Sequence, residues 1–298
     1  MAVLVADGEI VANAKRPTPR RCGPADVIDT IIRTIERVDP DATAGALGIG
    51  VPGPVIPGTG ILPAAPNLPG WDHDVEVARL LSERLGGRPV VVDNDVNVGT
   101  LAEHRYGAGV GVDNLLGVFA GTGVGAGLIL DGRLRQGPRG MAGEIGHTFV
   151  AFRDLVQEGP GRGELEDYAG RNSLEKRARH LVAKGESTTI FDIAGEGRVK
   201  SRVWREAIEG GDPMAEQLVD DAASAIAAAM ASAIALVDIE LIVLGGGLSE
   251  QLGEGFRIRV EEELLARAFA DTSAPVRAAR LGNTGGALGA ALLVEGLV

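Results

Sequence analysis

Cysteine is almost missing from this sequence, and its scarcity excludes two ways of stabilising a fold. Cys22 is the single cysteine among 298 residues, so the chain cannot form an intramolecular disulfide. A zinc site built from several cysteines is excluded for the same reason. Aromatic residues are also scarce, at 3% of the chain. The core must therefore consist of Val, Leu, Ile and Ala, which a chain of this length can bury without cross-links.

The sequence also lacks an excess of positive charge. It carries 29 Lys and Arg against 41 Asp and Glu, for a formal net charge of −12. This balance disfavours binding to nucleic acid and to an anionic membrane surface. The start offers no signal peptide, because Asp7 and Glu9 interrupt its short apolar run. We expect a cytoplasmic protein with no nucleic-acid or membrane partner.

A long hydrophobic run is the third absence. The best candidate, residues 222–237, is rich in alanine and falls short of the roughly 20 strongly apolar residues that a membrane-spanning helix needs. Asp221 and Asp238 flank it directly. The run therefore predicts a buried helix of a water-soluble core.

Strand-like and helix-like segments alternate along the whole chain, which predicts an α/β fold. The first half begins with a hairpin whose turn is Asp7-Gly8. The remaining predicted elements are helices over 26–38, 75–85 and 95–106, and strands over 44–51, 89–92, 115–119, 128–130 and 241–244.

One segment occurs in both halves. Val3-Leu-Val-Ala-Asp-Gly8 and Leu128-Ile-Leu-Asp-Gly132 each combine a short apolar strand with an Asp-Gly turn, which suggests a duplicated two-lobe fold. In the second half a glycine-rich loop begins ten residues before Asp131, whereas ten residues before Asp7 lies ahead of Met1. If the halves are equivalent, the first lobe lacks an opening strand and a phosphate loop. The alternative, that the halves simply differ, stays open.

Two glycine-rich turns follow buried strands. Backbone N–H groups in such turns can converge on an anion, and a ligand can approach the backbone closely where a strand ends in glycine. The alternative for each is a tight turn with no ligand. The candidate residues are Gly121, Thr122, Gly123 and Gly125 in the first turn, and Gly245, Gly246 and Gly247 in the second.

Several acids and one histidine are candidates for chemistry. Asp95 stands where a buried strand gives way to a helix, so it fits either a general base or a helix N-cap. Glu144 and His147 are three residues apart, which suits one side of a helical turn but also a surface acid beside a structural histidine. Glu166 opens a predicted helix, where an acid ordinarily complements the helix dipole.

Taken together, these motifs resemble the ROK family of sugar kinases and sugar-responsive repressors, from about Val3 to the carboxyl end. The matching motifs are Gly48-Ile-Gly-Val-Pro-Gly-Pro54, Pro66-Asn-Leu-Pro-Gly-Trp71, Asp93-Asn-Asp-Val-Asn97, Gly121-Thr-Gly-Val-Gly-Ala-Gly127, Gly143-Glu-Ile-Gly-His147 and Leu244-Gly-Gly-Gly247.

The resemblance implies an actin-like, hexokinase-like (ribonuclease H-like) fold with two lobes and a central cleft. We expect a small lobe over 1–114, completed by a helix over 284–298, and a large lobe over 115–283. It also implies that Asp95 is the catalytic base and that the two glycine turns face the phosphates and nucleoside of ATP, with Mg²⁺. The sugar-holding residues it implies are Asn67, Asn94, Glu144, His147 and Glu166, and the expected assembly is a homodimer.

Two family features differ in this chain. The family normally opens with an Asp-x-Gly-Gly-Thr phosphate hairpin, and this sequence starts after it. The family's zinc signature carries three cysteines, with the histidine of Gly-Glu-Ile-Gly-His as fourth ligand. Here Gly159-Pro-Gly-Arg-Gly-Glu-Leu-Glu166 contains no cysteine, and Glu164 stands where the last one would be. We expect no structural zinc.

The leading hypothesis is ATP-dependent phosphorylation of a hexose, glucose or a related sugar, at its 6-hydroxyl. One alternative is a non-catalytic sugar-binding regulator, whose relatives carry a helix-turn-helix that is not expected here. Another is a truncated, inactive kinase. The sequence leaves the sugar, and ATP or polyphosphate as donor, open.

Overall fold

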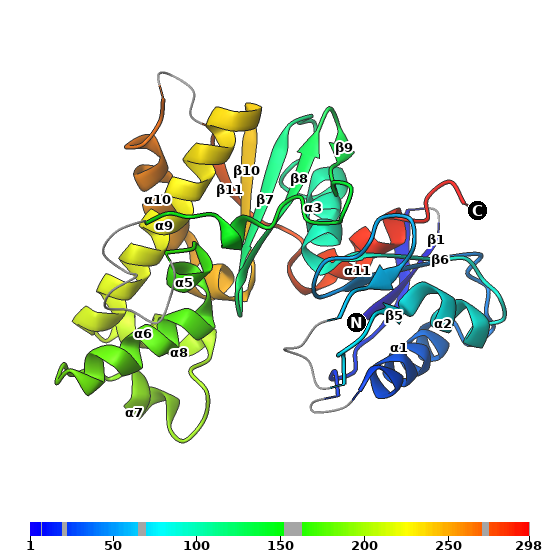
Figure 1. Ribbon diagram of the computed structural model, residues 1–298, viewed down its shortest axis with the longest axis horizontal. Coiled ribbons are helices and arrows are strands. Elements are labelled where there is room, and N and C mark those ends of the chain that lie inside the picture. Colours follow the sequence, from blue (N-terminus) through cyan, green and yellow to red (C-terminus); the bar gives the residue numbers. More distant parts are fainter. Residues whose placement is uncertain (7, 20–22, 65–69, 152–162, 270–273, 298) are drawn as a thin grey trace. The chain divides into compact units, whose positions relative to one another are not determined.

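The computed structural model of the chain describes residues 1–6, 8–19, 23–64, 70–151, 163–269 and 274–297 (Figure 1). It divides into two compact units, each built from stretches that are far apart in the sequence. Unit 1 comprises residues 1–107, 134–143 and 281–298, and unit 2 comprises residues 108–133 and 144–280. The units thus differ from the expected lobes chiefly in Leu134–Gly143, which belongs to unit 1.

Unit 1 contains short strands and four helices within its described residues. Its elements are β1 (Ala2–Ala6), β2 (Glu9–Ala14), α1 (Pro24–Val38), β3 (Leu47–Val51), β4 (Ile61–Leu62), β5 (Val75–Glu76), α2 (Val77–Arg84), β6 (Val90–Asn94), α3 (Asp95–Tyr106) and α11 (Gly282–Leu292).

The described strands of unit 1 form three separate two-stranded sheets. β1 pairs with β2 in the antiparallel sense, which fits the predicted hairpin, although Asp7 of its turn lies outside the described residues. β3 pairs with β6 in the parallel sense, from Leu47 opposite Val90 to Val51 opposite Asn94. β4 and β5 form a small antiparallel pair. The polar end of β6 therefore lies beside the carboxyl end of β3.

The helices of unit 1 pack in two pairs. α1 contacts α2, and α3 contacts α11 (Figure 1). α1 buries Ile28, Ile32 and Ile35, the apolar stripe of a helix with one face in the core. α11 comes from the other end of the chain and also packs on β3 and β1. Both ends of the chain are therefore needed to complete this unit.

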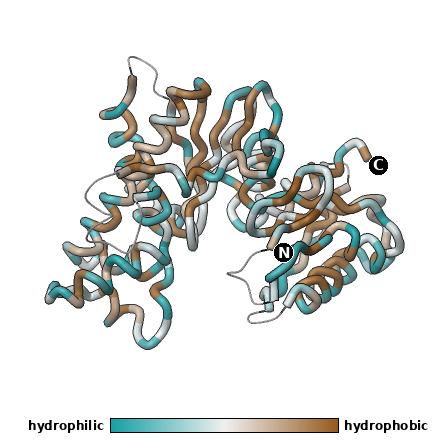
Figure 2. The backbone as a smooth tube through the Cα atoms, viewed as in Figure 1, coloured by the Kyte–Doolittle hydropathy of each residue, from teal (hydrophilic) through white to brown (hydrophobic). Residues whose placement is uncertain are grey.

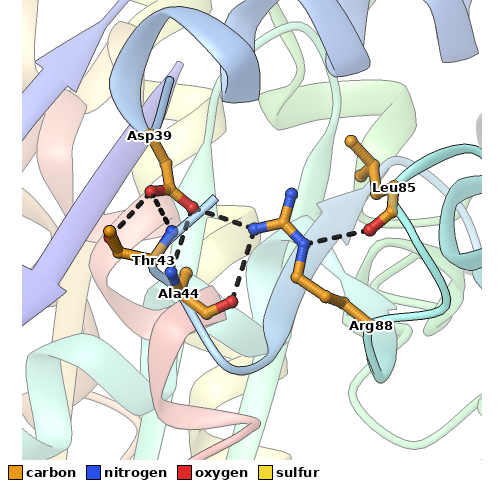
Figure 3. Close-up of polar contacts among 5 residues, drawn as sticks. All are labelled: Asp39, Thr43, Ala44, Leu85 and Arg88. Carbon is orange, nitrogen blue, oxygen red and sulfur yellow. Dashed lines mark hydrogen bonds and ion pairs between the residues drawn. The ribbon is translucent and has the colours of Figure 1, made fainter. Parts of the chain in front are cut away.

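An ion pair between Asp39 and Arg88 fastens the loops of unit 1 (Figure 3). The Asp39 side chain is only 4% exposed, and its carboxylate lies 2.9 Å from Arg88 Nη1. It also accepts the N–H and the hydroxyl of Thr43, at 2.7 and 2.8 Å, and the N–H of Ala44. Burial alone would raise the pKa of Asp39, but these hydrogen bonds lower it below its usual value. The pair ties the C-cap of α1 to the loop that precedes β6.

Unit 2 contains one five-stranded sheet in the order β11-β10-β7-β8-β9. Its strands are β7 (Leu115–Ala120), β8 (Val124–Leu130), β9 (Arg133–Leu134), β10 (Leu241–Gly245) and β11 (Val276–Ala278), and hydrophobic residues dominate the central ones (Figure 2). β7 pairs antiparallel to β8 and parallel to β10. Asp131 and Gly132 both have positive φ, as the predicted Asp-Gly hairpin turn requires.

Helices cover this sheet. They are α5 (Glu166–Ala169), α6 (Arg171–Ala183), α7 (Ile190–Ala194), α8 (Ser201–Glu209), α9 (Pro213–Val237) and α10 (Gly247–Leu265), with a short 3₁₀ turn, η1 (Ile145–His147). α9 is long and apolar enough to cross a membrane by length and composition. It instead contacts α5, α6, α8 and α10, and most of its apolar side chains lie in the core of unit 2. The predicted buried helix is therefore present.

Candidate functional site

Asp95 is the first residue of α3, directly after the buried strand β6. Its side chain is exposed. The N-cap of α3 is Asn94, whose side-chain oxygen accepts the N–H groups of Val96 and Asn97 at 2.8 and 3.1 Å. The N-cap alternative for Asp95 was therefore wrong: the neighbouring Asn94 satisfies the helix end.

Asn94 is held from both ends of its amide. Its oxygen caps α3, and its Nδ2 donates to the carbonyl of Gly53 at 3.0 Å. Asn94 thus connects the start of α3 to the Pro-Gly turn after β3. These two bonds fix the position of the backbone that carries Asp95.

A buried carboxylate stabilises the same corner. Asp93 is 2% exposed and accepts hydrogen bonds from Asn97 Nδ2 at 2.9 Å and Gln136 Nε2 at 2.7 Å. Gln136 lies in the stretch 134–143, which returns to unit 1 from unit 2. No local pattern predicts the contact with Gln136, because 43 residues separate the two partners. The hydrogen bonds of Asp93 therefore hold the start of α3 in place.

Three predicted sugar-holding residues lie in unit 2. Glu144 is half-buried and precedes η1, which ends at His147. Glu166 begins α5, and its Oε2 accepts the N–H of Val124 at 3.0 Å. A Cβ added at Gly123 would lie 2.5 Å from this carboxylate. The side chain of Glu166 therefore rests against the glycine turn between β7 and β8.

His147 is oriented by a carboxylate that the residue patterns did not single out as part of the site. His147 Nδ1 lies 3.0 Å from Glu164 Oε2. The imidazole is 65% exposed, whereas the Glu164 side chain is only 14% exposed. Glu164 is therefore the fixed member of the pair, and it leaves the Nε2 edge of His147 available to a ligand.

The acids around His147 change its charge and that of Glu144. The hydrogen bond that the protonated ring donates to Glu164 raises the pKa of His147 above 6.5. Burial opposes this shift, and the charges of the three nearby glutamates add to it. Burial raises the pKa of Glu144 above 4.5, with His147 opposing the shift and Glu166 adding to it. The surrounding acids thus stabilise the protonated form of the imidazole relative to an ordinary histidine.

The two glycine turns are neighbours in unit 2. β7 and β10 run parallel with Phe119 opposite Gly245, so the turns that follow them leave the same sheet edge. Gly246 has φ +91°, and a Cβ there would lie 2.5 Å from the carbonyl oxygen of Ala120. Only glycine allows the two backbones to approach this closely.

The first turn is anchored by α6. The carbonyl groups of Gly121 and Thr122 accept the N–H groups of Arg171 and Asn172, each at 3.1 Å. Arg171 Nη2 also donates to the Thr122 hydroxyl at 3.0 Å. The positively charged guanidinium of Arg171 therefore lies beside the turn. The sequence alone did not indicate this charge, because Arg171 is far from the turn along the chain.

The second turn leads into α10, whose N-cap is Gly246 and whose backbone is kinked at Gly253. The first N–H groups of a helix have no partner within it and carry partial positive charge, so they suit a phosphate group. A Cβ at Gly121 or at Gly247 would meet nothing within 4 Å. The residues present thus fit a phosphate-bearing ligand.

Asn67, another predicted sugar-holding residue, lies outside the described residues. Asp95 and Asn94 belong to unit 1, whereas Glu144, His147, Glu166 and both glycine turns belong to unit 2. Within the described part of the chain, no group of three or more His, Cys, Asp or Glu side chains is arranged to hold a metal ion.

Comparison with known proteins identifies the class of protein to which this chain belongs. The chain is an α/β protein with the actin-like, hexokinase-like fold of ROK hexokinases. The ROK glucokinase of Streptomyces griseus, solved in complex with glucose and AMPPNP, matches it with a TM-score of 0.81 at 28% identity, over 99% of this chain and 95% of that one. The ROK family model matches residues 1–296, and the chain belongs to this family.

Two curated relatives show the range of the family. A glucokinase from Thermotoga maritima is 32% identical over 99% of this chain and 93% of its own length. A xylose repressor from Caldicellulosiruptor bescii is 28% identical over 82% of this chain and 60% of its own length.

Proposed function

We propose that this ROK-family sugar kinase transfers the γ-phosphoryl group of ATP to the 6-hydroxyl of a hexose, glucose or a close relative. The observation that carries the proposal is Asp95, an exposed carboxylate on a helix start that Asn94 and Asp93 hold in place. The glucokinase relatives and the structure with glucose and AMPPNP support the substrate classes. We also propose a cytoplasmic homodimer, as the family resemblance implies.

In the proposed mechanism, Asp95 accepts the proton of the attacking hydroxyl or holds that hydroxyl in line. Phosphoryl transfer depends mainly on positioning and charge stabilisation, so a fixed carboxylate is sufficient as a base. MgATP, when bound, supplies the phosphoryl group. The N–H groups of the two glycine turns and the Arg171 guanidinium would hold the phosphates.

Glu144, His147 and Glu166 would hold the sugar hydroxyls. Carboxylates accept hydrogen bonds from hydroxyl groups, and a protonated imidazole donates one through Nε2. Such a polar site discriminates against epimers that leave one of its groups unpaired. Asn94 would contribute by position, because its amide is engaged with α3 and Gly53, and Asn67 is a further candidate.

The substitution Asp95→Asn tests this function. We expect phosphate transfer to be lost while sugar affinity falls by less than about tenfold, since the amide keeps the shape of the side chain but not its basicity. Asp26→Asn is the matched control, because Asp26 is an exposed acid in the first turn of α1 in the same unit. Coupled-enzyme assays and calorimetric sugar binding on both variants give the result. Near-normal turnover in Asp95→Asn would contradict the assignment of the base.

A second candidate is a sugar-binding regulator, which the xylose repressor relative favours. Such a protein would bind glucose or a related sugar with the same glutamates and His147. The two functions differ in the unmodified chain, where mass spectrometry would detect hexose phosphate only for the kinase. Sugar binding with no product formed from ATP or polyphosphate would support the regulator.

A further inference from the structure

The segment between β9 and η1 contains a closed loop, residues 136–142. The N–H of Ala142 donates to the carbonyl of Gln136 at 3.0 Å, and the N–H of Gly140 donates to the carbonyl of Gly137 at 3.3 Å. Both glycines have positive φ, which other residues rarely adopt. The loop belongs to unit 1, although the chain on either side of residues 134–143 belongs to unit 2. It is therefore a structured part of unit 1 rather than an open connection.

The far end of this loop packs against the turn that follows β3. Gly140 is buried, and a Cβ added to it would lie 2.0 Å from the carbonyl oxygen of Val55. Gly53 of the same turn accepts the hydrogen bond from Asn94 Nδ2 at 3.0 Å. The turn after β3 therefore contacts both the loop and the N-cap of α3.

The near end of the loop contacts the buried acid next to that N-cap. Asp93 Oδ1 accepts the N–H of Asn94 at 2.7 Å and Asn97 Nδ2 at 2.9 Å, and its Oδ2 accepts Gln136 Nε2 at 2.7 Å. The first two donors belong to the N-cap and first turn of α3, so the third connects Asp93 to a different part of the chain. Asp93 is 2% exposed. Losing the bond from Gln136 is therefore costly, because a buried carboxylate needs its hydrogen-bond donors.

We propose that Gln136 is a positioning residue for Asp95, an inference that rests on the proposed function, in which Asp95 is the base. The bond from Gln136 to Asp93 and the packing of Gly140 close a ring of contacts around the start of α3, whose first residue is Asp95. A displacement of this backbone displaces the Asp95 carboxylate with it. A misplacement of about 1 Å can lower a rate by about 100-fold.

A glutamine suits this position because of its hydrogen-bonding chemistry. Its amide donates to the Asp93 carboxylate without bringing a second charge into the core. The same amide can turn over and accept a hydrogen bond instead. A carboxylate at position 136 could only accept, and it would repel Asp93. The contact can therefore be tested by exchanging the chemical roles of the two side chains.

The variant Gln136→Glu places two carboxylates against each other. Adding Asp93→Asn restores one amide and one carboxylate, with the donor now at the end of β6. The amide oxygen at position 93 can still accept the two bonds that Oδ1 accepts. Asp93→Asn alone is the reference for this double variant, because the amide of Gln136 can turn over and accept a bond from it.

Gln217→Glu is the matched control. Gln217 is exposed on α9 of unit 2, and its Nε2 donates to Asp221 Oδ1 at 2.9 Å. The control thus makes the same change, from an amide to a carboxylate facing an aspartate, away from the start of α3. Its kcat and sugar affinity should both stay within about twofold of the parent values, as for most surface substitutions.

We expect Gln136→Glu to lower kcat for hexose phosphorylation by about tenfold or more. Its sugar affinity should change by less than about threefold, because the three proposed sugar-holding residues of unit 2 are unchanged. In the Asp93→Asn background the same substitution should lower kcat by less than about threefold, since the pair is restored. An equal fall in kcat and affinity would overturn the inference, as would an undiminished loss of kcat in the double variant.

Amide hydrogen exchange makes the test independent of the proposed reaction. In Gln136→Glu the N–H groups of Val96 and Asn97, which Asn94 caps, should exchange about tenfold faster, whereas those of α1 in the same unit should not change. Unchanged exchange of the two capped amides would overturn the inference. A parent chain without phosphorylation activity would instead reject the proposed function, and the exchange would still show whether Gln136 holds the start of α3.

A second variant covers the case in which Gln136→Glu does not fold. Gln136→Met has a side chain of similar length and removes the donor without adding a charge. The same faster exchange at Val96 and Asn97 and the same selective fall in kcat are expected from it. Parent-like values of both in Gln136→Met would overturn the inference.

Discussion

At the scale of single residues, the contact between His147 and Glu164 orients one of the predicted sugar-holding side chains. Glu164 is well shielded from solvent and lies 3.0 Å from one ring nitrogen, so it holds the imidazole in place and raises its pKa. Because Nδ1 is engaged, Nε2 is the nitrogen that can meet a sugar hydroxyl. If His147 holds a sugar hydroxyl as proposed, Glu164 acts as a positioning residue through the histidine.

Replacing Glu164 by Gln should return the pKa of His147 towards 6.5, since the hydrogen bond that His147 donates to Glu164 is the main cause of the raised value. NMR titration of the histidine side chains measures this directly. The signals of the other three histidines, His73, His104 and His180, are the internal controls. A curve for His147 that does not move would contradict the role of Glu164.

The raised pKa of His147 also makes the stability of the fold depend on pH. The folded pKa of His147 is higher than the unfolded one, so the pair stabilises the fold at pH values below about 6.5 and loses this contribution as the pH rises through the folded pKa. Thermal melting of Glu164→Gln should accordingly differ more from the parent chain at pH 5.5 than at pH 8.5.

The residue patterns predict candidate reactive groups but not the hydrogen-bond partners that hold them. Asp95 is a candidate base from its place between strand and helix, but its sequence position also allows a capping role, which Asn94 performs instead. The bonds from Asp93 to Gln136 and from His147 to Glu164 join residues 43 and 17 positions apart. No local spacing rule predicts such contacts, because tertiary packing decides them.

At the scale of elements, the turn between β7 and β8 connects the two candidate ligand sites of unit 2. Its carbonyl groups are held by the start of α6, and Val124 just after it holds Glu166. Gly123 lies between these contacts, with the Glu166 carboxylate against its Cα. A change in the turn should therefore move the carboxylate of Glu166, which we propose to hold the sugar.

The substitution Gly123→Ala should weaken sugar binding by about tenfold or more, because the new methyl group would occupy the position of the Glu166 carboxylate and break its bond to Val124. The loss of one hydrogen bond to a charged group is worth about 1.5–3 kcal/mol. Calorimetric titration with glucose measures the effect. Gly121→Ala is the control in the same turn, since its Cβ meets nothing within 4 Å, and its sugar affinity should stay within about twofold. Equal losses in both variants would show that the turn acts only on the fold.

Elements were more predictable than contacts. The alternating apolar pattern located β1, α1, β7 and β10 to within a few residues, because their periodicity is strong. The predicted helix over 75–85 begins instead at Val77, since Val75 and Glu76 pair with β4. Such short strands exist only through their partners, so their own sequence carries little signal.

At the scale of the whole molecule, each unit is assembled from separated stretches of chain. Residues 134–143 and 281–298 complete unit 1, although they follow long segments that belong to unit 2. α11 is the clearest case, because it packs on α3, β3 and β1 from the opposite end of the sequence. The stability of unit 1 must therefore depend on the fit of α11.

This fit depends on two glycines at close backbone contacts. A Cβ at Gly289 of α11 would lie 1.7 Å from the carbonyl oxygen of Val98 in α3, and one at Gly48 of β3 would lie 1.7 Å from that of Ala290. Both atoms that would be struck belong to the backbone, so no side chain can move aside. The helix can approach α3 and β3 only because these positions carry no side chain.

We expect Gly289→Ala to lower the free energy of unfolding of unit 1 by about 1–3 kcal/mol or more, because the methyl group must push α11 away from α3. Gly286→Ala in the same helix is the matched control: its Cβ meets nothing within 4 Å, and alanine favours a helix over glycine by up to about 1 kcal/mol.

The two tryptophans allow the unfolding of each unit to be followed separately, since Trp71 is buried in unit 1 and Trp204 in unit 2. Urea unfolding followed by fluorescence in Trp204→Phe and Trp71→Phe backgrounds therefore reports on each unit alone. The Trp71 transition should move to lower urea in Gly289→Ala and stay or rise in Gly286→Ala. If Gly289→Ala instead left the Trp71 transition in place, the close packing of α11 on α3 would not be what stabilises unit 1.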